Sequence, residues 1–449
     1  MTHAGRVDVA VVGAGLAGLV AALSAASEGC RVTLIEATAR PGGNARIAAG
    51  VFIASDSLAA LRAYVPDGDP ALQALFVAGY PDAMAFLEGQ GVPLGTLERA
   101  PGSRVLRPMG LGQPGRRDAF VDGLVERVRK AGVRIRVNSP VRSIEPAGGG
   151  YCVRFSAAGD VCASRVVMAT GGFAASPDLL AEFMGPGAAH LRRRSLDGAA
   201  GDGLRLARSL GAALAGDMAA YYGHTMADCP LEVDQWQPLT PYFARLGILV
   251  DRRGRRFTDE SASFLEEANP QAATRAGIDR YWMIVDERIR TGDAVEVGIA
   301  QRADWLQAAC AAGVPLVVAD SLAGLAAQLA ADGVDGDALI AEVEGFNAAV
   351  RAGRGSALAM PRTAAATPLE RAPFYAMRAV AGITATCGGI AVDTDCRVLA
   401  PDRQPIPGLY AAGVDAGGVF GRTYAGFLSW CAVSGRQAGL SAARAAPRT

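Results

Sequence analysis

Three glycines near the N-terminus have the spacing that a dinucleotide diphosphate requires. The segment from Gly13 to Gly18 reads Gly-Ala-Gly-Leu-Ala-Gly, a GxGxxG pattern. In this pattern the first glycine permits a tight turn, the second lets the backbone approach a pyrophosphate, and the third lets a helix pack against a strand. The free amides at the start of that helix attract phosphates. The pattern therefore predicts diphosphate binding by Gly13, Gly15, Ala17 and Gly18.

The elements expected around these glycines support that prediction. Val7–Val12 is a short apolar run with β-branched residues, which is typical of a buried parallel strand, and an Ala-rich helix is expected to follow to about Gly29. A second strand over 31–35 ends in Glu36, about 20 residues after the glycines, where an acid can bind a ribose hydroxyl. Strand, glycines, helix, strand and acid in this order predict a Rossmann-type unit.

The next segment distinguishes between the common dinucleotides. Gly42 and Gly43 let backbone pass close to a flat ring or a diphosphate, and they precede the string NARIAAG. This segment resembles the GGNAKLAAGG stretch of the fumarate reductase and succinate dehydrogenase flavoprotein superfamily (FAD-binding type 2), which includes the 3-ketosteroid dehydrogenases. The resemblance implies FAD, held non-covalently because no histidine lies just after the paired glycines, where members with covalent flavin have one. It also implies cofactor contacts at Ala37, Gly42, Gly43, Asn44, Ala48, Ala49 and Gly50.

Later segments extend the resemblance over nearly the whole chain. They are a Ser-Pro-Val string at 139–141, an Ala-Thr-Gly-Gly turn at 169–172, Gly-Asp-Gly at 201–203, and LYAAGVD at 409–415. The last of these resembles the family's LYAAGE, whose acid meets the ribityl chain. A final helix over about 428–443 is expected to point its N-terminus at the flavin and stabilise negative charge there. The residues implied in FAD binding are Val141, Ala169, Thr170, Gly171, Asp202, Gly413, Asp415, Leu428 and Ser429.

The domain organisation follows from where these segments lie. A chain of 449 residues exceeds what a single core usually holds. We expect an α/β protein with a Rossmann-type, glutathione-reductase-like FAD-binding domain formed by 1–215 and 367–449, and an inserted α+β capping domain over 216–366. The insert contains LGILVDRRGRRFTDE at 246–260, which resembles the family's GILVNxxGxRFxDE hairpin, and a mostly helical stretch over 303–350.

Four groups that mark fumarate reductases can be compared with this sequence. The family's carboxylate-binding histidine is retained as His224. The segment 261–265 lacks the proton-delivering arginine, Ala385 replaces a second histidine, and Tyr424 stands where a carboxylate-clamping arginine would be. Charge-assisted contacts to a carboxylate are strong, and an unpaired charge in a closed site costs several kcal/mol. The sequence therefore argues against fumarate reductase activity.

The replacement at Tyr424 suggests a different reaction. Thr423-Tyr424-Ala425-Gly426 resembles the TYPGxG motif of ketosteroid dehydrogenases, in which the tyrosine hydrogen-bonds the substrate ketone. The resemblance implies that Tyr424 is catalytic and that Gly426 lies beside the substrate. A donor aimed at a developing enolate is typically worth about 3 kcal/mol. A base then removes the α-proton, and the flavin takes a hydride from the β-carbon.

The base and the other substrate contacts are expected on the insert and near Tyr424. His224 is the first candidate for the base, because a histidine titrates near neutrality, and Tyr221 and Tyr222 are alternatives. Arg422 and Arg245 are candidate contacts for a substrate carboxylate. For each of these residues a purely structural role is the alternative.

Composition restricts the partners. The 44 basic and 44 acidic residues cancel, which disfavours nucleic acid. The eight cysteines form no CxxC, haem or cluster motif, as in a reduced cytosolic protein, and no metal site is expected. The first strand begins close to Met1, and no long apolar window is present, so we expect a cytoplasmic protein without membrane insertion. The expected partners are a small-molecule substrate and an unidentified electron acceptor, with the oligomeric state undefined.

The leading prediction is a FAD-dependent oxidoreductase that forms or reduces a C=C bond conjugated with the carbonyl of a ketone, including cyclic ketones and ketones with a carboxylate. One alternative is a tricarballylate-dehydrogenase-like enzyme for di- or tricarboxylic acids, anchored by His224 and Arg422. Others are a flavin hydroxylase and a flavin-bound sensor or binding protein with a decayed site. The retained histidine and the new Tyr424 disfavour the last alternative.

Overall fold

The computed structural model describes residues 6–100, 104–108, 116–155, 159–236, 238–263, 266–292 and 305–445. The described chain forms two compact units. The first comprises Met1–Leu179, Ser195–Ala220 and Ala385–Thr449, and the second comprises Leu180–Arg194 and Tyr221–Thr384. Within the described residues, no helix combines the length and apolar character needed to cross a bilayer.

A largely parallel sheet forms the centre of the first unit. Its strands lie in the order β18-β19-β9-β1-β2-β6, and β8 and β7 extend it from one end of β9. β1 pairs in parallel with both β2 and β9, so the first strand of the chain is central and buried on both sides. The strands are β1 (Val7–Val12), β2 (Val32–Ile35), β6 (Arg134–Arg136), β7 (Val141–Ala147), β8 (Gly150–Phe155), β9 (Asp160–Met168), β18 (Arg397–Leu399) and β19 (Pro405–Ala411).

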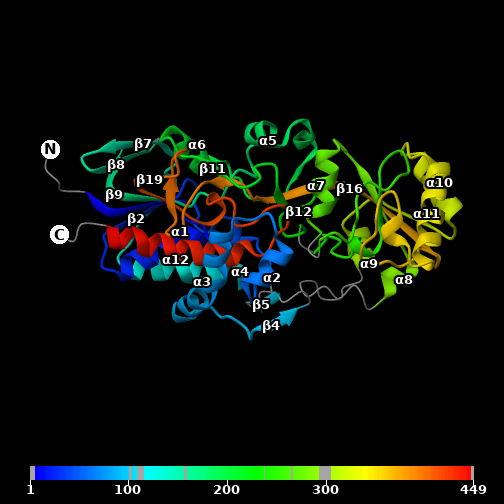
Figure 1. Cartoon of the computed structure of the whole chain (residues 1–449), viewed down its shortest axis with the longest axis horizontal. Helices are drawn as coiled ribbons and strands as arrows, with labels where there is room; N and C mark the ends of the chain where they lie inside the picture. The colour runs from blue at the N-terminus through cyan, green and yellow to red at the C-terminus, as the bar shows by residue number, and fades with distance from the viewer. Residues whose placement is uncertain are drawn as a thin grey trace. The chain divides into compact units, whose positions relative to one another are not determined.

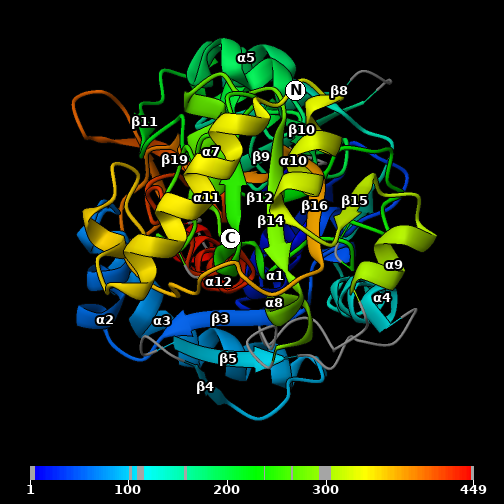
Figure 2. The same ribbon diagram turned by 90° about the vertical axis from the view of Figure 1, so that its right-hand side faces the viewer.

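Helices α1 (Leu16–Ser27) and α12 (Phe427–Ala445) lie side by side in the first unit, although they come from opposite ends of the chain (Figure 1). The same unit contains a small antiparallel sheet with the strand order β3-β5-β4, which is seen in Figure 2. The remaining elements are β3 (Val51–Ser55), α2 (Leu58–Tyr64), α3 (Pro70–Gly89), β4 (Glu98–Ala100), β5 (Arg104–Pro108), α4 (Arg116–Lys130), α6 (Asp202–Ser209), β11 (Leu214–Ala215) and β17 (Gly389–Ile390). The expected Rossmann-type α/β arrangement is confirmed.

The second unit is an α+β body built on a mixed sheet. Its longest strand, β16 (Phe374–Thr386), pairs with β14, β15, β12 and β10, and β13 continues beyond β14. The other elements are α5 (Pro177–Met184), β10 (Arg192–Arg193), β12 (Tyr221–Ala227), β13 (Ile248–Val250), α7 (Ala268–Arg275), β14 (Tyr281–Asp286), α8 (Glu287–Thr291), α9 (Trp305–Ala311), β15 (Leu316–Ala319), α10 (Leu322–Ala330) and α11 (Gly336–Arg351). The helical stretch expected over 303–350 contains α9, α10 and α11, interrupted by β15; residues 303 and 304 lie outside the described residues.

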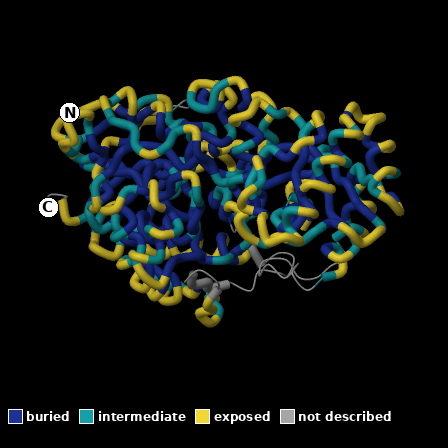
Figure 3. Tube along the Cα trace, turned by 45° about the vertical axis from the view of Figure 1, so that its right-hand side comes forward, coloured by how far each residue is buried: buried dark blue, intermediate teal, exposed yellow. Residues whose placement is uncertain are grey.

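The observed limits of the second unit differ from the expected 216–366. β16 is a single strand of 13 residues that pairs with most of that unit's sheet, so the unit extends to Thr384 rather than to 366. The short strand β10 pairs in parallel with β16, which places Leu180–Arg194 in the second unit as well. Figure 3 shows that each unit has its own buried interior, and in the first unit this includes β1 and α1.

Candidate active site

The glycines of the first turn are held in place by close backbone contacts. Gly13 has a φ of +99°, and a Cβ there would come within 2.2 Å of the Ala169 carbonyl oxygen. A Cβ on Gly18, the third residue of α1, would lie 1.8 Å from the Gly13 carbonyl oxygen, so only glycine allows the helix to pack against the turn at this position. A Cβ on Gly15, in contrast, would meet no protein atom within 4 Å. The turn thus packs tightly at its two ends and leaves space at Gly15, as a bound diphosphate requires.

The paired glycines lie beside that space. Gly42 has a φ of +126° and donates its N–H to the Ala14 carbonyl at 2.8 Å, which forms a bridge between Gly15 and Gly42. Asn44 follows in a short 3-10 turn, and its Oδ1 accepts the Leu196 N–H at 2.8 Å. Segments expected to bind FAD, although separated in sequence, therefore meet at Gly15.

Glu36 has a structural role in addition to the predicted ribose contact. Its carboxylate is buried and accepts the Ala14 N–H at 2.9 Å, the Thr38 N–H at 2.9 Å and the Thr38 hydroxyl at 2.8 Å. These contacts connect the end of β2 to the glycine turn. The contact to a ribose hydroxyl stays a prediction.

Asp415 connects two other expected cofactor segments. Its buried carboxylate accepts the Gly172 N–H at 2.8 Å, the Thr170 hydroxyl at 2.9 Å and the Thr170 N–H. Burial raises the pKa of Asp415, and the hydrogen bonds from Thr170 and Gly172 oppose that shift. The expected ribityl contact is not tested, but the carboxylate clearly joins the 169–172 turn to the segment before α12.

Buried hydroxyls without partners provide a test of whether FAD fits this unit. Among the described residues of the first unit, the buried hydroxyl oxygens with no hydrogen-bond partner include those of Ser24 in α1, Ser195, Thr386 and Ser429. A buried polar group without a partner costs about 1–3 kcal/mol, so these hydroxyls call for a polar ligand. A Cβ on Gly171, whose φ is +98°, would meet no atom within 4 Å. A Cβ on the neighbouring Gly172 would lie 2.7 Å from the Thr386 Oγ1, so an unsatisfied hydroxyl borders this open turn, which fits FAD. Ser195 and Thr386 were not foreseen from the sequence.

The remaining residues expected to contact FAD all lie in the first unit. Ala37 is exposed after β2, Ala48 and Ala49 are half-buried, and Gly50 precedes β3 with a φ of +76°. Their roles in FAD binding stay predictions. The same holds for five residues in or next to later elements: Val141 at the start of β7, Ala169 after β9, Asp202 at the start of α6, Gly413, whose N–H donates to the Ser434 hydroxyl, and Leu428 in the first turn of α12.

Tyr424 lies in the loop that leads into α12. It is 7% exposed, and its ring packs against Phe420 and Phe427 at centroid distances of 6.0 and 5.5 Å. Gly426 has a φ of +125°, and a Cβ there would lie 2.1 Å from the Ile53 carbonyl oxygen. Gly426 is therefore required for the loop to pass β3, whatever contact it makes with a substrate.

His224 is more deeply buried than its predicted role as a base suggests. It lies on β12 with no exposed surface, and its Nε2 is 2.8 Å from the Tyr222 hydroxyl. The ring lies edge-on to Tyr222 and Tyr242 at 4.9 and 5.0 Å. Burial, together with the positive charge of Arg194, lowers the pKa of His224 well below its usual value. The expectation of titration near neutrality was wrong, because the imidazole has lost its solvent.

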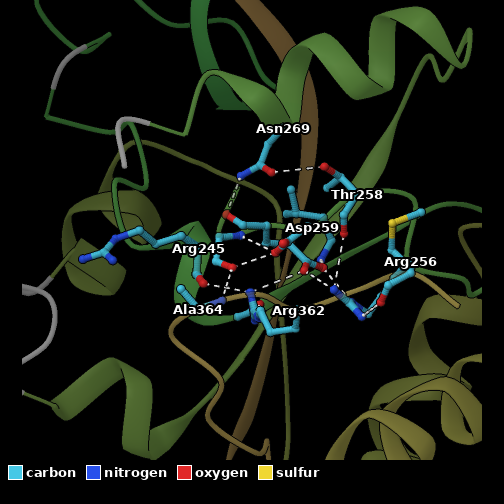
Figure 4. A network of polar contacts seen from close by, with 12 residues as sticks. Arg245, Arg256, Thr258, Asp259, Asn269, Arg362 and Ala364 are labelled. Atoms are coloured by element: carbon cyan, nitrogen blue, oxygen red, sulfur yellow. Dashed lines mark hydrogen bonds and ion pairs between the residues drawn. The ribbon is translucent and has the colours of Figure 1, made fainter. Parts of the chain in front are cut away.

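The arginines proposed for a substrate carboxylate have other contacts. The Arg422 Nε lies 3.1 Å from the Asp217 carboxylate, and the Arg422 N–H donates to Asp67. Arg245 contributes its backbone to the second unit: its N–H donates to Glu266, and its carbonyl accepts from Arg362. Figure 4 shows the Arg245 side chain directed away from that network. The substrate roles of Arg422 and Arg245 stay predictions, and the Arg422 guanidinium already forms an ion pair with Asp217.

The motif at 246–260 forms a buried ionic network (Figure 4). Arg256 donates twice to Glu260, and Arg362 lies 3.3 Å from the same carboxylate, all with side chains that have no exposed surface. Both guanidinium groups stack on Phe346, at 5.0 and 5.3 Å. The Glu260 carboxylate also accepts the Leu249 N–H at 2.9 Å. This network stabilises the start of β13. The segment 261–265, which contains no arginine, follows this motif, and its residues 264 and 265 lie outside the described residues.

Comparisons with known proteins agree with this geometry. The family model described as FAD binding domain matches residues 8–426. Fumarate reductase (cytochrome) of Shewanella frigidimarina is 30% identical over 98% of this chain and 77% of that protein. A 4-oxocyclohex-2-ene-1-carboxylate 5-dehydrogenase of Sinomonas cyclohexanicum is 28% identical over 73% of this chain and 60% of that protein. The structure of 3-ketosteroid-Δ4-(5α)-dehydrogenase from Rhodococcus jostii RHA1 superposes with a TM-score of 0.74, at 23% identity, over 98% of this chain and 97% of that one.

The chain belongs to the FAD-binding family that contains the fumarate reductases, as the resemblance implied. It is a FAD-dependent oxidoreductase of the class that acts on CH–CH groups.

Proposed function

We propose that this protein is a dehydrogenase that introduces a C=C bond conjugated with the carbonyl of a ketone. The observation that carries the proposal is the position of Tyr424, a buried phenol in the loop directly before α12. The family resemblance implies an arginine at this place in fumarate reductases. A neutral phenol suits a ketone oxygen, whereas a guanidinium suits a carboxylate. The Sinomonas relative, whose name describes dehydrogenation of a ring ketone, supports the same chemistry.

The residues that would hold FAD are those around Gly15, Gly42 and Gly171 and the hydroxyls of Thr386 and Ser429. Bound FAD supplies the hydride acceptor. We propose that the cofactor is non-covalent, because no histidine lies just after Gly42 and Gly43, where members with covalent flavin have one.

In this proposal Tyr424 donates a hydrogen bond to the carbonyl oxygen and stabilises the negative charge that develops when the α-proton leaves. His224 stays the proposed centre of proton removal, and its lowered pKa keeps it in the neutral form that a base requires. Because Tyr222 is half-buried whereas His224 has no exposed surface, the Tyr222 hydroxyl is the member of this pair that meets the substrate. The Tyr222 oxygen takes the α-proton as the Tyr222 hydroxyl gives its own proton to Nε2 of His224 across the 2.8 Å hydrogen bond.

The test is anaerobic bleaching of the flavin by ketones, saturated di- and tricarboxylates, and NADPH. We expect bleaching by cyclic ketones, and Tyr424→Phe is expected to slow it at least tenfold while FAD stays bound. Tyr151→Phe is the matched control, because its hydroxyl donates to the Pro407 carbonyl in the β7-β8-β9 region of the same unit. An unchanged rate in Tyr424→Phe would contradict the role given to its phenol.

The same panel separates the alternatives. Bleaching by di- or tricarboxylates alone would favour an acid dehydrogenase, although Arg422, its proposed anchor, is ion-paired with Asp217. Bleaching by NADPH would indicate a hydroxylase, and no bleaching by any compound would indicate a sensor or binding protein.

A further inference from the structure

Two cysteines face each other across neighbouring strands of the first unit. β8 and β9 pair antiparallel, and their register places Cys152 directly opposite Cys162. Figure 1 shows the two strands side by side. The two cysteines form no CxxC motif in the sequence, because strand pairing and not sequence spacing brings them together. The pair belongs entirely to the first unit, so its geometry depends on one sheet only.

The geometry of this pair is suitable for a disulfide bond. Directly opposed residues of an antiparallel pair have Cα atoms about 4.5 or about 5.5 Å apart, within the range of roughly 4.4–6.8 Å that disulfides span. Side chains two residues further along lie on the same face of the sheet. There the Arg154 Nη1 lies 2.7 Å from the Asp160 Oδ2 across the same two strands. The thiols of Cys152 and Cys162 are themselves hydrogen-bonded to each other.

The two thiols differ in how they meet solvent. Cys162 is exposed, whereas Cys152 is buried, with 8% of its surface exposed. Burial, and then the hydrogen bond to Cys162, raises the pKa of the Cys152 thiol above its usual value. The thiolate is the reactive form of cysteine, and its reaction requires access. A reagent in solution therefore meets Cys162 first, and Cys152 lies in contact with it as a second thiol.

We propose that Cys152 and Cys162 form a redox-active dithiol, which low-molecular-weight disulfides convert to an intramolecular disulfide between β8 and β9. The Cys162 thiolate attacks one sulfur of the external disulfide, and the first external thiol leaves with the proton that Cys162 lost. Cys152 then gives up its proton and attacks the Cys162 sulfur of the mixed disulfide, and the second external thiol leaves with that proton. The protein loses two electrons and two protons, and the external disulfide gains them. The flavin takes no part in this exchange.

The first experiment detects the new bond directly. The holoenzyme is incubated with glutathione disulfide, the remaining thiols are blocked with N-ethylmaleimide, and the protein is digested with trypsin without reduction. Cleavage after Arg142, Arg154 and Arg165 gives the peptides 143–154 and 155–165, which contain one cysteine each. We expect mass spectrometry to find these two peptides joined in most molecules and separated by dithiothreitol. Separate peptides, with glutathione or N-ethylmaleimide on Cys162, would overturn the proposal.

Variants test the order of attack. In Cys152→Ala the reaction should stop at the mixed disulfide, so that Cys162 retains glutathione. In Cys162→Ser no joined peptide can form, and the buried Cys152 should stay unmodified. Modification of Cys152 in Cys162→Ser as fast as that of Cys162 in Cys152→Ala would contradict the roles given to the two thiols. Cys310→Ser is the matched control, because it removes an exposed thiol of the second unit and should leave the joined peptides unchanged.

The dependence on glutathione concentration tests the wild-type protein alone, should Cys152→Ala fail to fold. Forming an intramolecular disulfide releases two glutathione molecules, whereas forming a mixed disulfide releases one. At a constant concentration of glutathione disulfide, a tenfold rise in glutathione should lower the ratio of oxidised to reduced protein about hundredfold for the intramolecular bond, against about tenfold for a mixed disulfide. We expect the hundredfold change. A tenfold change would show that Cys162 forms only a mixed disulfide and would overturn the proposal.

Discussion

Three buried acids in this chain show how neighbours decide the state of the same chemical group. Glu260 is shared by two arginines, and Asp415 accepts three hydrogen bonds from Thr170 and Gly172. The carboxyl group of Glu266 has fewer hydrogen-bond partners. It is 1% exposed, its Oε1 accepts the Arg245 N–H at 3.0 Å, and its Oε2 has no partner among the described residues. Burial raises the pKa of Glu266 to about 8, so the folded protein holds this carboxyl protonated at neutral pH.

Glu266 therefore makes the folded state more sensitive to alkali. An unfolded glutamate loses its proton near pH 4.3, whereas the folded one keeps it to about pH 8. Between these values the folded state binds more protons, so the free energy of unfolding falls as the pH rises, by at most about 1.4 kcal/mol per pH unit. Glu266→Gln should remove this fall. In urea unfolding from pH 5 to 9, the variant should gain on the wild type up to about pH 8 and then level off.

Glu344→Gln, an exposed glutamate on α11, is the control for that comparison and should show no such trend. A difference between Glu266→Gln and the wild type that is constant over the whole pH range would mean that Glu266 is ionised in the folded protein.

At the scale of elements, the turn between β1 and α1 contains one glycine that packing requires and another that only cofactor binding requires. Gly18 is a requirement of packing, because a Cβ would overlap the Gly13 carbonyl. Gly15 meets no protein atom, so its lack of a side chain matters only for what occupies the neighbouring space. In one motif, Gly18 is therefore required for packing of the protein and Gly15 for space beside the backbone.

Gly15→Ala should consequently fold normally and lose FAD. The expected result is an unchanged far-UV circular dichroism spectrum with flavin content lowered at least tenfold after dialysis. Gly18→Ala should instead lower the melting temperature of the apoprotein, since the added methyl group displaces α1. Gly123→Ala in α4, where a Cβ also meets nothing, is the control and should keep both FAD and stability. Full flavin content in Gly15→Ala would show that the diphosphate lies elsewhere.

At the scale of the whole molecule, the chain consists of two units with separate cores. The core of the second unit includes Trp282, Phe346 and the strands β13, β14 and β16. Its ionic network around Glu260 is confined to that unit. Substitutions in this network should therefore lower the thermal stability of the second unit first.

Glu260→Gln leaves two buried guanidinium groups without their carboxylate, which typically costs about 3–5 kcal/mol. We expect calorimetry to show an added transition at lower temperature, while the flavin fluorescence that reports FAD release still rises at the later transition. Arg252→Gln, which breaks the exposed pair with Asp279, is the control and should change little. A single calorimetric transition that coincides with FAD release would show that the two units unfold as one.

Local features of the sequence were sufficient for the nucleotide-binding part of this protein. The β1 strand, the turn from Gly13 to Gly18 and α12 were predicted nearly to the residue, because each depends on apolar periodicity and on glycine conformation within a short segment. The family resemblance added the cofactor and the class of reaction. These properties are encoded within a few consecutive residues, so no tertiary information is needed to recognise them.

Only the tertiary structure decided where the second unit ends and how its site is charged. The limit at Thr384 depends on long-range pairing of β16, and the lowered pKa of His224 depends on burial by residues distant in sequence. Arg194, whose positive charge contributes to that shift, stands in a run of three arginines with no distinguishing local pattern. Burial and pairing are sums over neighbours that the fold brings together, and a linear pattern does not contain them.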